Sequence, residues 1–246
     1  MSIPRFYCPA KLAVGAIVSL PENDAIHAAK ALRMQAGDKL VVFNGDGNDY
    51  GAEILRISKQ EVTAKIYAVK AVDRESPLDI TLVQAISSGE RMEFTLQKTV
   101  EMGINRIQPV AAERSVVKLS GERSDKRREH WQNVVIAAFK QSGRAVIPEV
   151  APIQGFNEWL GTPSDFALKL MLSPEGEQTL HDLPKPQGRI CLLIGCEGGF
   201  SPAEQQNAAL CGFVPVRLGK RILRTETAAL AAIAALQTLW GDYNLR

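Results

Sequence analysis

The sequence has few of the residues that build metal centres. Its 246 residues include four cysteines and three histidines, and no two cysteines form a CxxC pair. Structural zinc sites need such closely spaced ligands, so the sequence contains no recognisable metal site. The cysteines are predicted to be reduced thiols, and Cys191 and Cys211 to be small buried side chains.

Long apolar runs are also missing. No stretch approaches the roughly 20 apolar residues that a membrane-spanning helix needs, and residues 1–6 lack the pattern of a signal peptide. We therefore expect a cytoplasmic protein. Hydrophobic residues make up 46% of the chain and charged residues 23%, which is typical of a globular protein. The net charge of +2 is too small to indicate a partner by itself.

The specific nucleotide-binding motifs are absent as well. GxxxxGK[ST] does not occur, and the glycines near residue 198 do not follow GxGxxG, so nucleotide hydrolysis has no support. The chain has instead two stretches of similar design, residues 189–204 and 213–229. Each is a short apolar run that ends at a glycine and leads into a predicted helix. In α/β proteins, loops at the carboxyl ends of strands bind ligands.

The first glycine loop follows the apolar residues 191–194 and contains Gly198 and Gly199, where the chain must turn sharply. The sequence SPAE at 201–204 has the pattern of a capping box, which predicts a helix that begins with its proline. Glu197 would repel a phosphate group, so an adenosine-type ligand with a positive centre fits better than a triphosphate. A plain turn from strand to helix explains the same residues equally well.

The second glycine loop carries a cluster of positive charge. It follows the mostly apolar residues 213–218 and contains Lys220, Arg221 and Arg224. Thr225 is predicted to cap the last helix. The alanine-rich part of that helix has almost no polar side, so it is expected to be buried, either within the core or between subunits.

The rest of the chain indicates two domains of different class. Residues 1–72 contain short strands and tight turns, typical of a small β-barrel, with a short helix at residues 24–34. The polar stretch 73–77, which ends in proline, marks the boundary. Residues 73–246 alternate between strands and helices, which indicates a mostly parallel sheet covered by helices. We therefore predict an α/β fold class with domains at 1–72 and 73–246.

Two longer helices are predicted in the second domain. Residues 92–102 and 124–141 each place apolar side chains at helical spacing, and glycines follow at Gly103 and Gly143. Each helix should therefore bury one face against the sheet or another helix.

The two glycine loops together resemble one known family. IGCEGGFS (194–201) and LGKRILRTETA (218–228) are similar to the paired motifs of the bacterial 16S ribosomal RNA uridine N3-methyltransferases. These enzymes belong to the SPOUT superfamily, whose C-terminal domain contains a trefoil knot. The combined match of both loops is highly specific.

The resemblance extends over the whole chain. HAAKALRMQAGD (27–38), VFNGDGNDY (42–50) and KTVEMGI (98–104) look like further blocks of this family, and KQSGR (140–144) matches a fifth block imperfectly. The residues that differ from those usual in the family are Lys140, Ser142 and Cys196.

The resemblance implies S-adenosylmethionine as the cofactor, held by three loops of the knot. The cofactor-binding residues that it implies are Leu172, Ser173, Pro174, Ile194, Gly195, Glu197, Gly198, Gly199, Leu218, Gly219, Ile222, Leu223 and Thr225. It further implies a homodimer, a PUA-like β-barrel that binds RNA in residues 1–72, and 16S ribosomal RNA or the 30S subunit as substrate. The candidate RNA contacts are Arg5, Arg33, Arg144 and Lys220.

Three residues of the second glycine loop are candidates for the implied chemistry. Loss of the N3 proton leaves negative charge on the uracil ring, which Arg221 or Arg224 could stabilise as donors. Glu226 is a candidate proton acceptor, although its position fits an interaction with the helix dipole equally well. The alternative function is that of an RNA- or ribosome-binding protein without catalysis.

Overall fold

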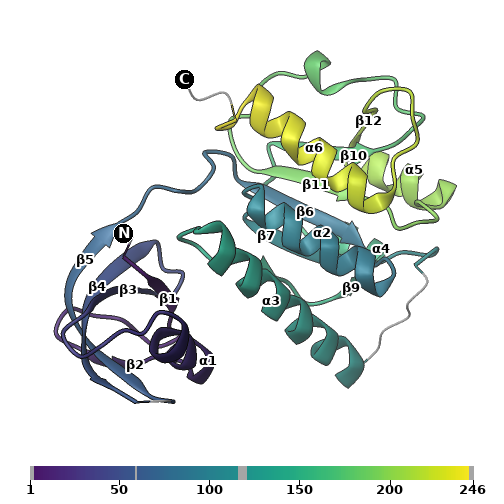
Figure 1. The fold of residues 1–246 in the computed structure, drawn as a ribbon. Coiled ribbons are helices and arrows are strands. Elements are labelled where there is room, and N and C mark those ends of the chain that lie inside the picture. Colours follow the sequence, from purple (N-terminus) through teal and green to yellow (C-terminus); the bar gives the residue numbers. More distant parts are fainter. Residues whose placement is uncertain (1–2, 59, 116–120, 244–246) are drawn as a thin grey trace. The chain divides into compact units, whose positions relative to one another are not determined.

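The computed structural model describes residues 3–58, 60–115 and 121–243. The chain forms two compact units (Figure 1). The first consists of Met1–Glu75 with Gly143–Ile147, and the second of Ser76–Ser142 with Pro148–Arg246. A short internal segment therefore returns to the first unit, which no pattern in the sequence indicated. Within the described ranges, no helix is long and apolar enough to cross a membrane.

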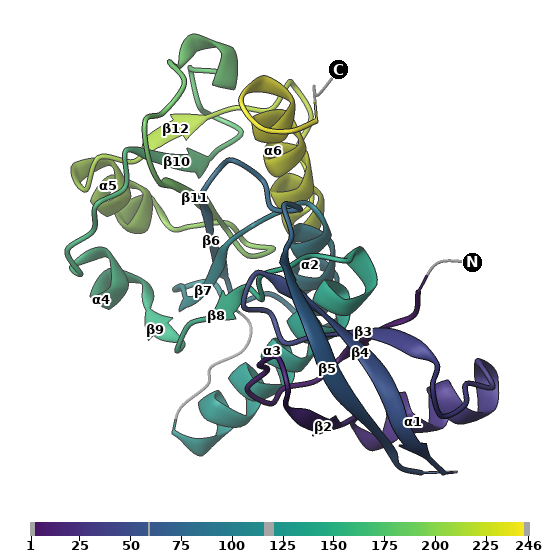
Figure 2. The ribbon, with the colours of Figure 1, turned by 90° about the vertical axis from the view of Figure 1, so that its left-hand side faces the viewer.

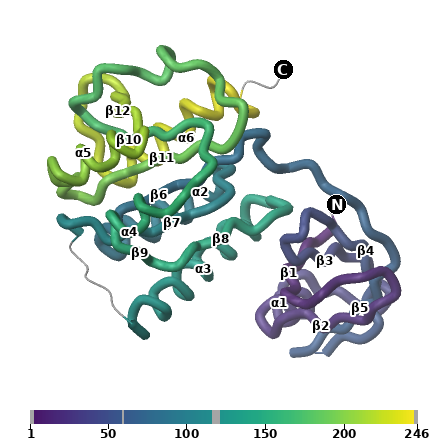
Figure 3. The backbone as a smooth tube through the Cα atoms, turned by 180° about the vertical axis from the view of Figure 1, so that it is seen from behind, coloured from purple at the N-terminus to yellow at the C-terminus, as the bar shows by residue number. Residues whose placement is uncertain are grey.

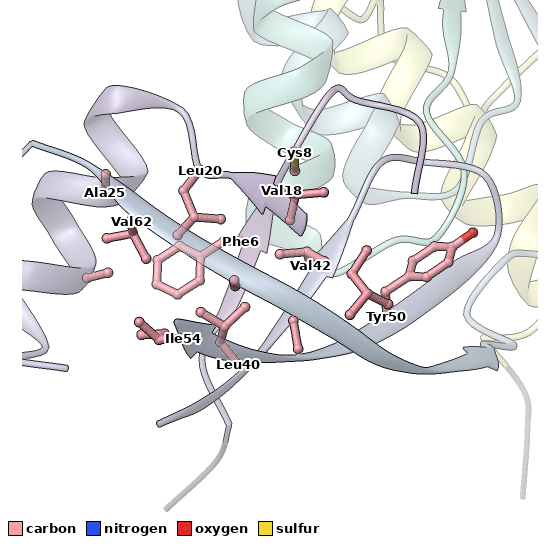
Figure 4. Packing of buried hydrophobic residues seen from close by; sticks show 14 of the residues in the cluster. Phe6, Cys8, Val18, Leu20, Ala25, Leu40, Val42, Tyr50, Ile54 and Val62 are labelled. Carbon is pink, nitrogen blue, oxygen red and sulfur yellow. The ribbon is translucent and has the colours of Figure 1, made fainter. Parts of the chain in front are cut away.

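One five-stranded sheet dominates the first unit. Its strands are β1 (Arg5–Tyr7), β2 (Ile17–Ser19), β3 (Lys39–Phe43), β4 (Asn48–Ile57) and β5 (Val62–Ala71). Their order in the sheet is β1-β3-β4-β5-β2. Apolar and polar residues alternate in β4 and the first half of β5, so one face of each strand is buried. Figure 4 shows Phe6, Leu40 and Val42 packed with these side chains in a single core.

The helix predicted at residues 24–34 has different bounds. Helix α1 (Glu22–Ile26) begins directly after Pro21 and continues as a π-helical turn, η1 (His27–Ala31). The helical run ends earlier than predicted because Arg33 adopts a left-handed backbone conformation, with φ of 52°. Proline at the start and the reversed φ at the end set these limits, and apolar spacing alone showed neither.

The returning segment 143–147 is held in the first unit by hydrogen bonds. The Glu75 carboxylate accepts from the backbone N–H groups of Ala145 and Val146, at 2.8 and 3.1 Å, and pairs with the Arg144 guanidinium. The Ala145 carbonyl accepts from the N–H of Gly47 at 3.0 Å. The glycine-rich block at residues 42–50 therefore contacts this segment directly and helps to hold it in the first unit.

The second unit contains a parallel sheet, as predicted. Its strands are β6 (Ile80–Ala85), β7 (Arg106–Ala111), β8 (Glu149–Val150), β9 (Gln154–Gly155), β10 (Leu168–Leu172), β11 (Ile190–Ile194) and β12 (Val214–Val216). The order is β12-β10-β11-β6-β7-β8, with β9 also paired to β7. Every pairing is parallel, and the central strands β6 and β11 are buried along their whole length.

Helices cover this sheet on both faces (Figure 2). They are α2 (Gly89–Glu101), α3 (Glu122–Ser142), α4 (Phe156–Leu160), the 3-10 turn η2 (Leu180–Asp182), α5 (Pro202–Leu210) and α6 (Thr225–Leu239). Helix α2 packs against α3 and α6 on one face, and α4 packs against α5 on the other. The two longer helices that the sequence predicted are α2 and α3, and each buries its predicted apolar face.

Strands β10, β11 and β12 lie next to one another although long segments separate them in the chain (Figure 3). Strand order does not by itself trace the threading of a loop, so the trefoil knot stays a prediction. Strand β11 ends at Ile194, as the apolar run 191–194 predicted, and β10 ends at Leu172.

The cysteines are free thiols. Cys191 is fully buried in β11, so the prediction of a small buried side chain is confirmed, and burial raises the pKa of its thiol to about 12. Cys211 is only half-buried, at the end of α5, which is less than predicted.

Candidate functional site

A cavity of about 530 Å³ lies at the carboxyl ends of several strands of the parallel sheet. It lies where β10, β11 and β12 end, which is the expected ligand-binding edge of a parallel sheet. All of the predicted cofactor-binding residues line it: Leu172, Ser173, Pro174, Ile194, Gly195, Glu197, Gly198, Gly199, Leu218, Gly219, Ile222, Leu223 and Thr225. Three loops that are separate in the sequence thus line one cavity. Their contact with a cofactor stays a prediction.

The predicted capping box after the first glycine loop is confirmed. The Glu204 N–H donates to Ser201 Oγ at 3.3 Å, and the Ser201 N–H donates to Glu204 Oε2 at 2.9 Å. Glu204 Oε1 also accepts from the N–H of Glu113 at 2.8 Å. Helix α5 therefore starts at Pro202, and its buried carboxylate joins the loop to the segment after β7.

The first glycine loop folds tightly onto itself. A Cβ atom on Gly195 would lie 3.0 Å from the Cα of Gly199, and one on Gly198 would lie 3.1 Å from the Cβ of Arg114. Gly199 adopts φ of 66°, which is costly for other residues. The Arg114 side chain also donates to the Gly198 carbonyl at 3.0 Å. These glycines are required by close approach and backbone conformation, which gives the loop one fixed path.

Glu197 is an anchor of this loop. Its Oε1 accepts from the Ser88 N–H at 3.0 Å and lies 3.2 Å from a guanidinium nitrogen of Arg91. Burial by itself would raise the pKa of the carboxyl, but the hydrogen bonds from Ser88 and the charge of Arg91 hold that pKa below its ordinary value. The carboxylate is therefore ionised at neutral pH and largely neutralised by protein groups.

The prediction that Thr225 caps the last helix is wrong. Arg224 occupies the N-cap position, and its side chain makes no capping hydrogen bond. Thr225 is the first helical residue, and its hydroxyl donates to the Gly195 carbonyl at 2.6 Å and accepts from Gln84 Nε2 at 3.0 Å. The hydroxyl has a tertiary partner on the neighbouring loop, which local sequence could not show.

Arginines within and just before the second glycine loop line the cavity. Arg217, Arg221 and Arg224 are exposed residues that line it, and they form no ion pair with any residue in the described ranges. Together with Arg91 and Arg114 they make the lining strongly basic, because Glu197 is the only acidic residue among the described residues that line it. Such a cavity mouth favours an anion or a group that becomes negative.

Two candidates from the same loop lie elsewhere. Lys220 is exposed and does not line the cavity. Glu226 is half-buried in the first turn of α6 and does not line it either. Its Oε2 is buried and has no hydrogen-bond partner among the described residues. The geometry therefore gives more support to the helix-dipole role of Glu226 than to the catalytic one.

The candidate RNA contacts of the first unit have different surroundings. Arg5 lies 2.7 Å from the Asp49 carboxylate, with its guanidinium carbon 4.3 Å from the centre of the Phe43 ring. Arg144 is 5% exposed and paired with Glu75. Arg33 is exposed. The guanidinium of Arg144 already serves this buried pair, so the structure favours a structural role over RNA contact for Arg144.

Sequence patterns missed several residues of the cavity wall. These are Arg91, Arg114, Met171, Cys196, Phe200, Gln205, Val216, Arg217 and Ala228. Four of them flank a predicted loop by one or two residues, so wider loop limits would have included them. Arg91 and Arg114 come from other elements of the chain, and no local signal points to them.

A second cavity of about 350 Å³ lies near the amino ends of β7 and β10. It is lined by aromatic and basic residues that include Phe213, Lys169 and Arg189, and by none of the predicted site residues. No group of three or more His, Cys, Asp or Glu side chains in the described ranges could hold a metal ion.

Comparison with known families assigns both parts of the chain. The family described as RNA methyltransferase domain matches residues 74–237, and the RNA methyltransferase PUA domain matches residues 20–67. The ribosomal RNA small subunit methyltransferase E of Buchnera aphidicola subsp. Schizaphis graminum is 38% identical over 242 residues, which is 98% of each chain. The chain belongs to the ribosomal RNA small subunit methyltransferase E family. The Bacillus subtilis member is 31% identical over 232 residues, which are 89% of this chain and 88% of the Bacillus chain.

Two solved structures share the fold of this chain over almost its whole length. The Neisseria gonorrhoeae methyltransferase E bound to S-adenosylmethionine has a TM-score of 0.89 and 46% identity, over 99% of this chain and 100% of that one. A putative methyltransferase of Legionella pneumophila, in complex with the same cofactor, also has a TM-score of 0.89, with 40% identity over 98% and 100%. The resemblance noted in the glycine loops is confirmed, as is the pairing of a PUA-like domain with an α/β methyltransferase domain.

Proposed function

We propose that the protein transfers the methyl group of S-adenosylmethionine to N3 of a uridine in 16S ribosomal RNA of the small subunit. The observation that carries this proposal is the cavity between the two glycine loops, in a member of a family whose Neisseria relative was crystallised with that cofactor. Family membership supports the methylation of small-subunit RNA. The choice of uridine N3 rests on the loop resemblance and on the chemistry of the arginines.

The residues present fit the cofactor. The cavity volume of about 530 Å³ lies in the range of ordinary small-molecule sites. Apolar side chains, among them Leu172, Ile194 and Leu218, line the cavity and offer surface to an adenine ring. S-adenosylmethionine supplies an electrophilic methyl group when it is bound. The basic lining suits the carboxylate of its methionine part.

Arg224 and Arg221 are the proposed catalytic donors. Uracil N3 is a weak acid, and loss of its proton spreads negative charge over N3 and both carbonyl oxygens. Exposed guanidinium groups at the cavity mouth could donate hydrogen bonds to those oxygens as charge develops. A cation at the N-cap of α6 is unfavourable for the helix dipole, so the position of Arg224 is better explained by function than by stability.

The proposed assembly follows from the same family membership. A ribosomal RNA substrate places the reaction in the cytoplasm and makes the 30S subunit the partner. A homodimer is also proposed, because the outer side of α6 presents small, half-buried residues such as Ala231, Ala234 and Ala235 that would allow close packing of a second copy. Light scattering coupled to gel filtration would measure the mass directly.

Nucleoside mass spectrometry tests the reaction. Purified protein is incubated with unmodified 30S subunits and S-adenosylmethionine that carries a deuterated methyl group, and the RNA is then digested. We expect deuterated N3-methyluridine as the single labelled nucleoside. A labelled nucleoside methylated at another atom would overturn the N3 assignment, and RNA binding without label would support the non-catalytic alternative.

A further inference from the structure

Gln84 is a buried polar residue at the centre of the second unit. It lies near the carboxyl end of β6 and is fully buried. A buried amide is costly unless its polar atoms are hydrogen-bonded. A hydrophobic residue would fill the same place in a central strand at lower cost, so the partners of this amide indicate what it contributes.

The amide nitrogen of Gln84 has three acceptors within reach. Nε2 lies 3.0 Å from the Ala85 carbonyl, 3.0 Å from Thr225 Oγ1 and 3.4 Å from the Gly195 carbonyl. The opposite amide orientation would place Oε1 against two carbonyl oxygens, so the observed orientation is the favourable one. Oε1 has no hydrogen-bond partner in the described part of the chain. The amide therefore acts through donation from its nitrogen.

Thr225 completes a closed set of hydrogen bonds. Its hydroxyl accepts from Gln84 and donates to the Gly195 carbonyl at 2.6 Å, so both of its roles are used. Gly195 is the first residue of the first glycine loop, and Thr225 ends the second. The network thus joins β6 to the two loops, at the point where each loop meets a regular element.

Gly195 and Thr225 line the cavity, whereas Gln84 does not. We propose that Gln84 is a positioning residue for the cofactor cavity: it fixes the two glycine loops to each other and so holds the cavity open at the width that S-adenosylmethionine needs. The cofactor part of this inference rests on the proposed function. The fixing of the loops is a property of the protein alone and can be measured without any ligand.

The test uses the whole protein and two independent measurements. Gln84→Met removes the amide with little change of volume, and Thr225→Val removes the hydroxyl while it keeps the branched shape. Hydrogen–deuterium exchange reports the opening of residues 195–199 and 219–226 in the ligand-free protein. Calorimetry gives the Kd for S-adenosylmethionine.

Both variants should loosen the same two loops. We expect faster exchange in residues 195–199 and 219–226 together, and a Kd raised by about fivefold to tenfold in each variant, the scale of one lost buried hydrogen bond. The Kd of the double variant should be close to that of the single variant with the higher Kd, because both substitutions break the same network.

Gln108 provides a matched control. It is 6% exposed on the neighbouring strand β7, and its Nε2 donates to the carbonyls of Pro109 and Pro152 at 2.9 and 2.8 Å. It does not line the cavity between the loops. Gln108→Met should lower Tm as Gln84→Met does, but leave the exchange of both loops and the Kd unchanged.

The outcomes separate this inference from the proposed function. Unchanged loop exchange in Gln84→Met, or an equal effect of Gln108→Met on the loops and the Kd, would overturn the positioning role. If the wild-type protein shows no binding of S-adenosylmethionine, the proposed function fails, and loop exchange still decides whether Gln84 fixes the loops.

Discussion

Two sets of arginines in this protein illustrate opposite uses of one side chain. Arg224 and Arg221 are exposed at a cavity mouth and have no ion-pair partner among the described residues. Arg144 is 5% exposed and serves the Glu75 carboxylate. All three were candidates for function on the same ground, as positive charges in distinctive stretches. The comparison teaches that the freedom of a guanidinium, and not its presence, separates a group available for chemistry from one that stabilises the fold.

The strongest test of this comparison is Arg224→Ala. If Arg224 stabilises charge on the uracil ring, the variant should lose about 10²–10³-fold in kcat, as when one donor to a developing anion is removed. Its Tm should not fall, because the side chain makes no capping bond. Single-turnover methylation of 30S subunits measures the rate. Arg123→Ala, at an exposed position in α3, is the control for loss of a surface charge. A wild-type rate in Arg224→Ala would remove its catalytic role.

Arg144→Ala should have the opposite profile. The variant leaves Glu75 with two backbone donors and 22% side-chain exposure, so we expect a loss of about 2 kcal/mol of stability, the value of a hydrogen bond to a charged group. Urea unfolding of the whole protein would show this loss. Arg33→Ala, an exposed arginine of the same unit, should change the free energy of unfolding by less than about 0.5 kcal/mol. Equal effects of both variants would contradict the structural role of Arg144.

Features that depend on neighbouring residues in the chain were predictable. The capping box at 201–204 needs only a serine and a glutamate three residues apart, and both hydrogen bonds are present. The apolar faces of α2 and α3 follow from helical spacing in the same way. Two of the three loops around the cavity, the glycine loops, could be named because ligands bind at the carboxyl ends of parallel strands, whereas the loop at residues 172–174 was implied only by the family resemblance.

Features that depend on contacts between residues far apart in the chain could not be predicted from the sequence. Gln84 and Thr225 are 141 residues apart, and Thr225 could not be assigned to a tertiary bond before its partner was known. The segment 143–147 joins the first unit through Glu75, about 70 residues earlier, and its own sequence carries no strand or helix signal. The family block at 42–50 acquires a physical meaning only in the structure, where the Gly47 N–H donates to the carbonyl of Ala145, the residue that follows the block at 140–144.

The Glu75–Arg144 pair also predicts a pH dependence. Burial by itself would raise the pKa of Glu75, but hydrogen bonds from Arg144, Ala145 and Val146 hold it below its ordinary value. Because the pKa of Glu75 is lower in the folded than in the unfolded protein, its carboxylate contributes stability fully above the ordinary glutamate pKa of about 4.3. This contribution is lost as the pH falls through the pKa of Glu75 in the folded protein. Urea midpoints between pH 7 and acid should therefore fall more steeply for wild type than for Glu75→Gln. The stability lost when Glu75 is protonated should be smaller than that lost in Arg144→Ala, because a protonated carboxyl group still accepts hydrogen bonds.

The smallest expected effect concerns Glu226, the acidic neighbour of Arg224. Its carboxylate does not line the cavity and lies in the first turn of α6, where a negative charge interacts favourably with the helix dipole. Glu226→Gln should therefore cost about 0.3–1 kcal/mol of stability and leave most of the methylation rate. The same single-turnover assay measures the rate, beside the urea midpoint. A rate loss of about 10²-fold or more with unchanged stability would instead identify Glu226 as the proton acceptor. In that case a position outside the cavity lining would not exclude a side chain from catalysis. The contrast of Arg221 and Arg224 with Arg144, which rests on position and partners in the same way, would then have to be revised.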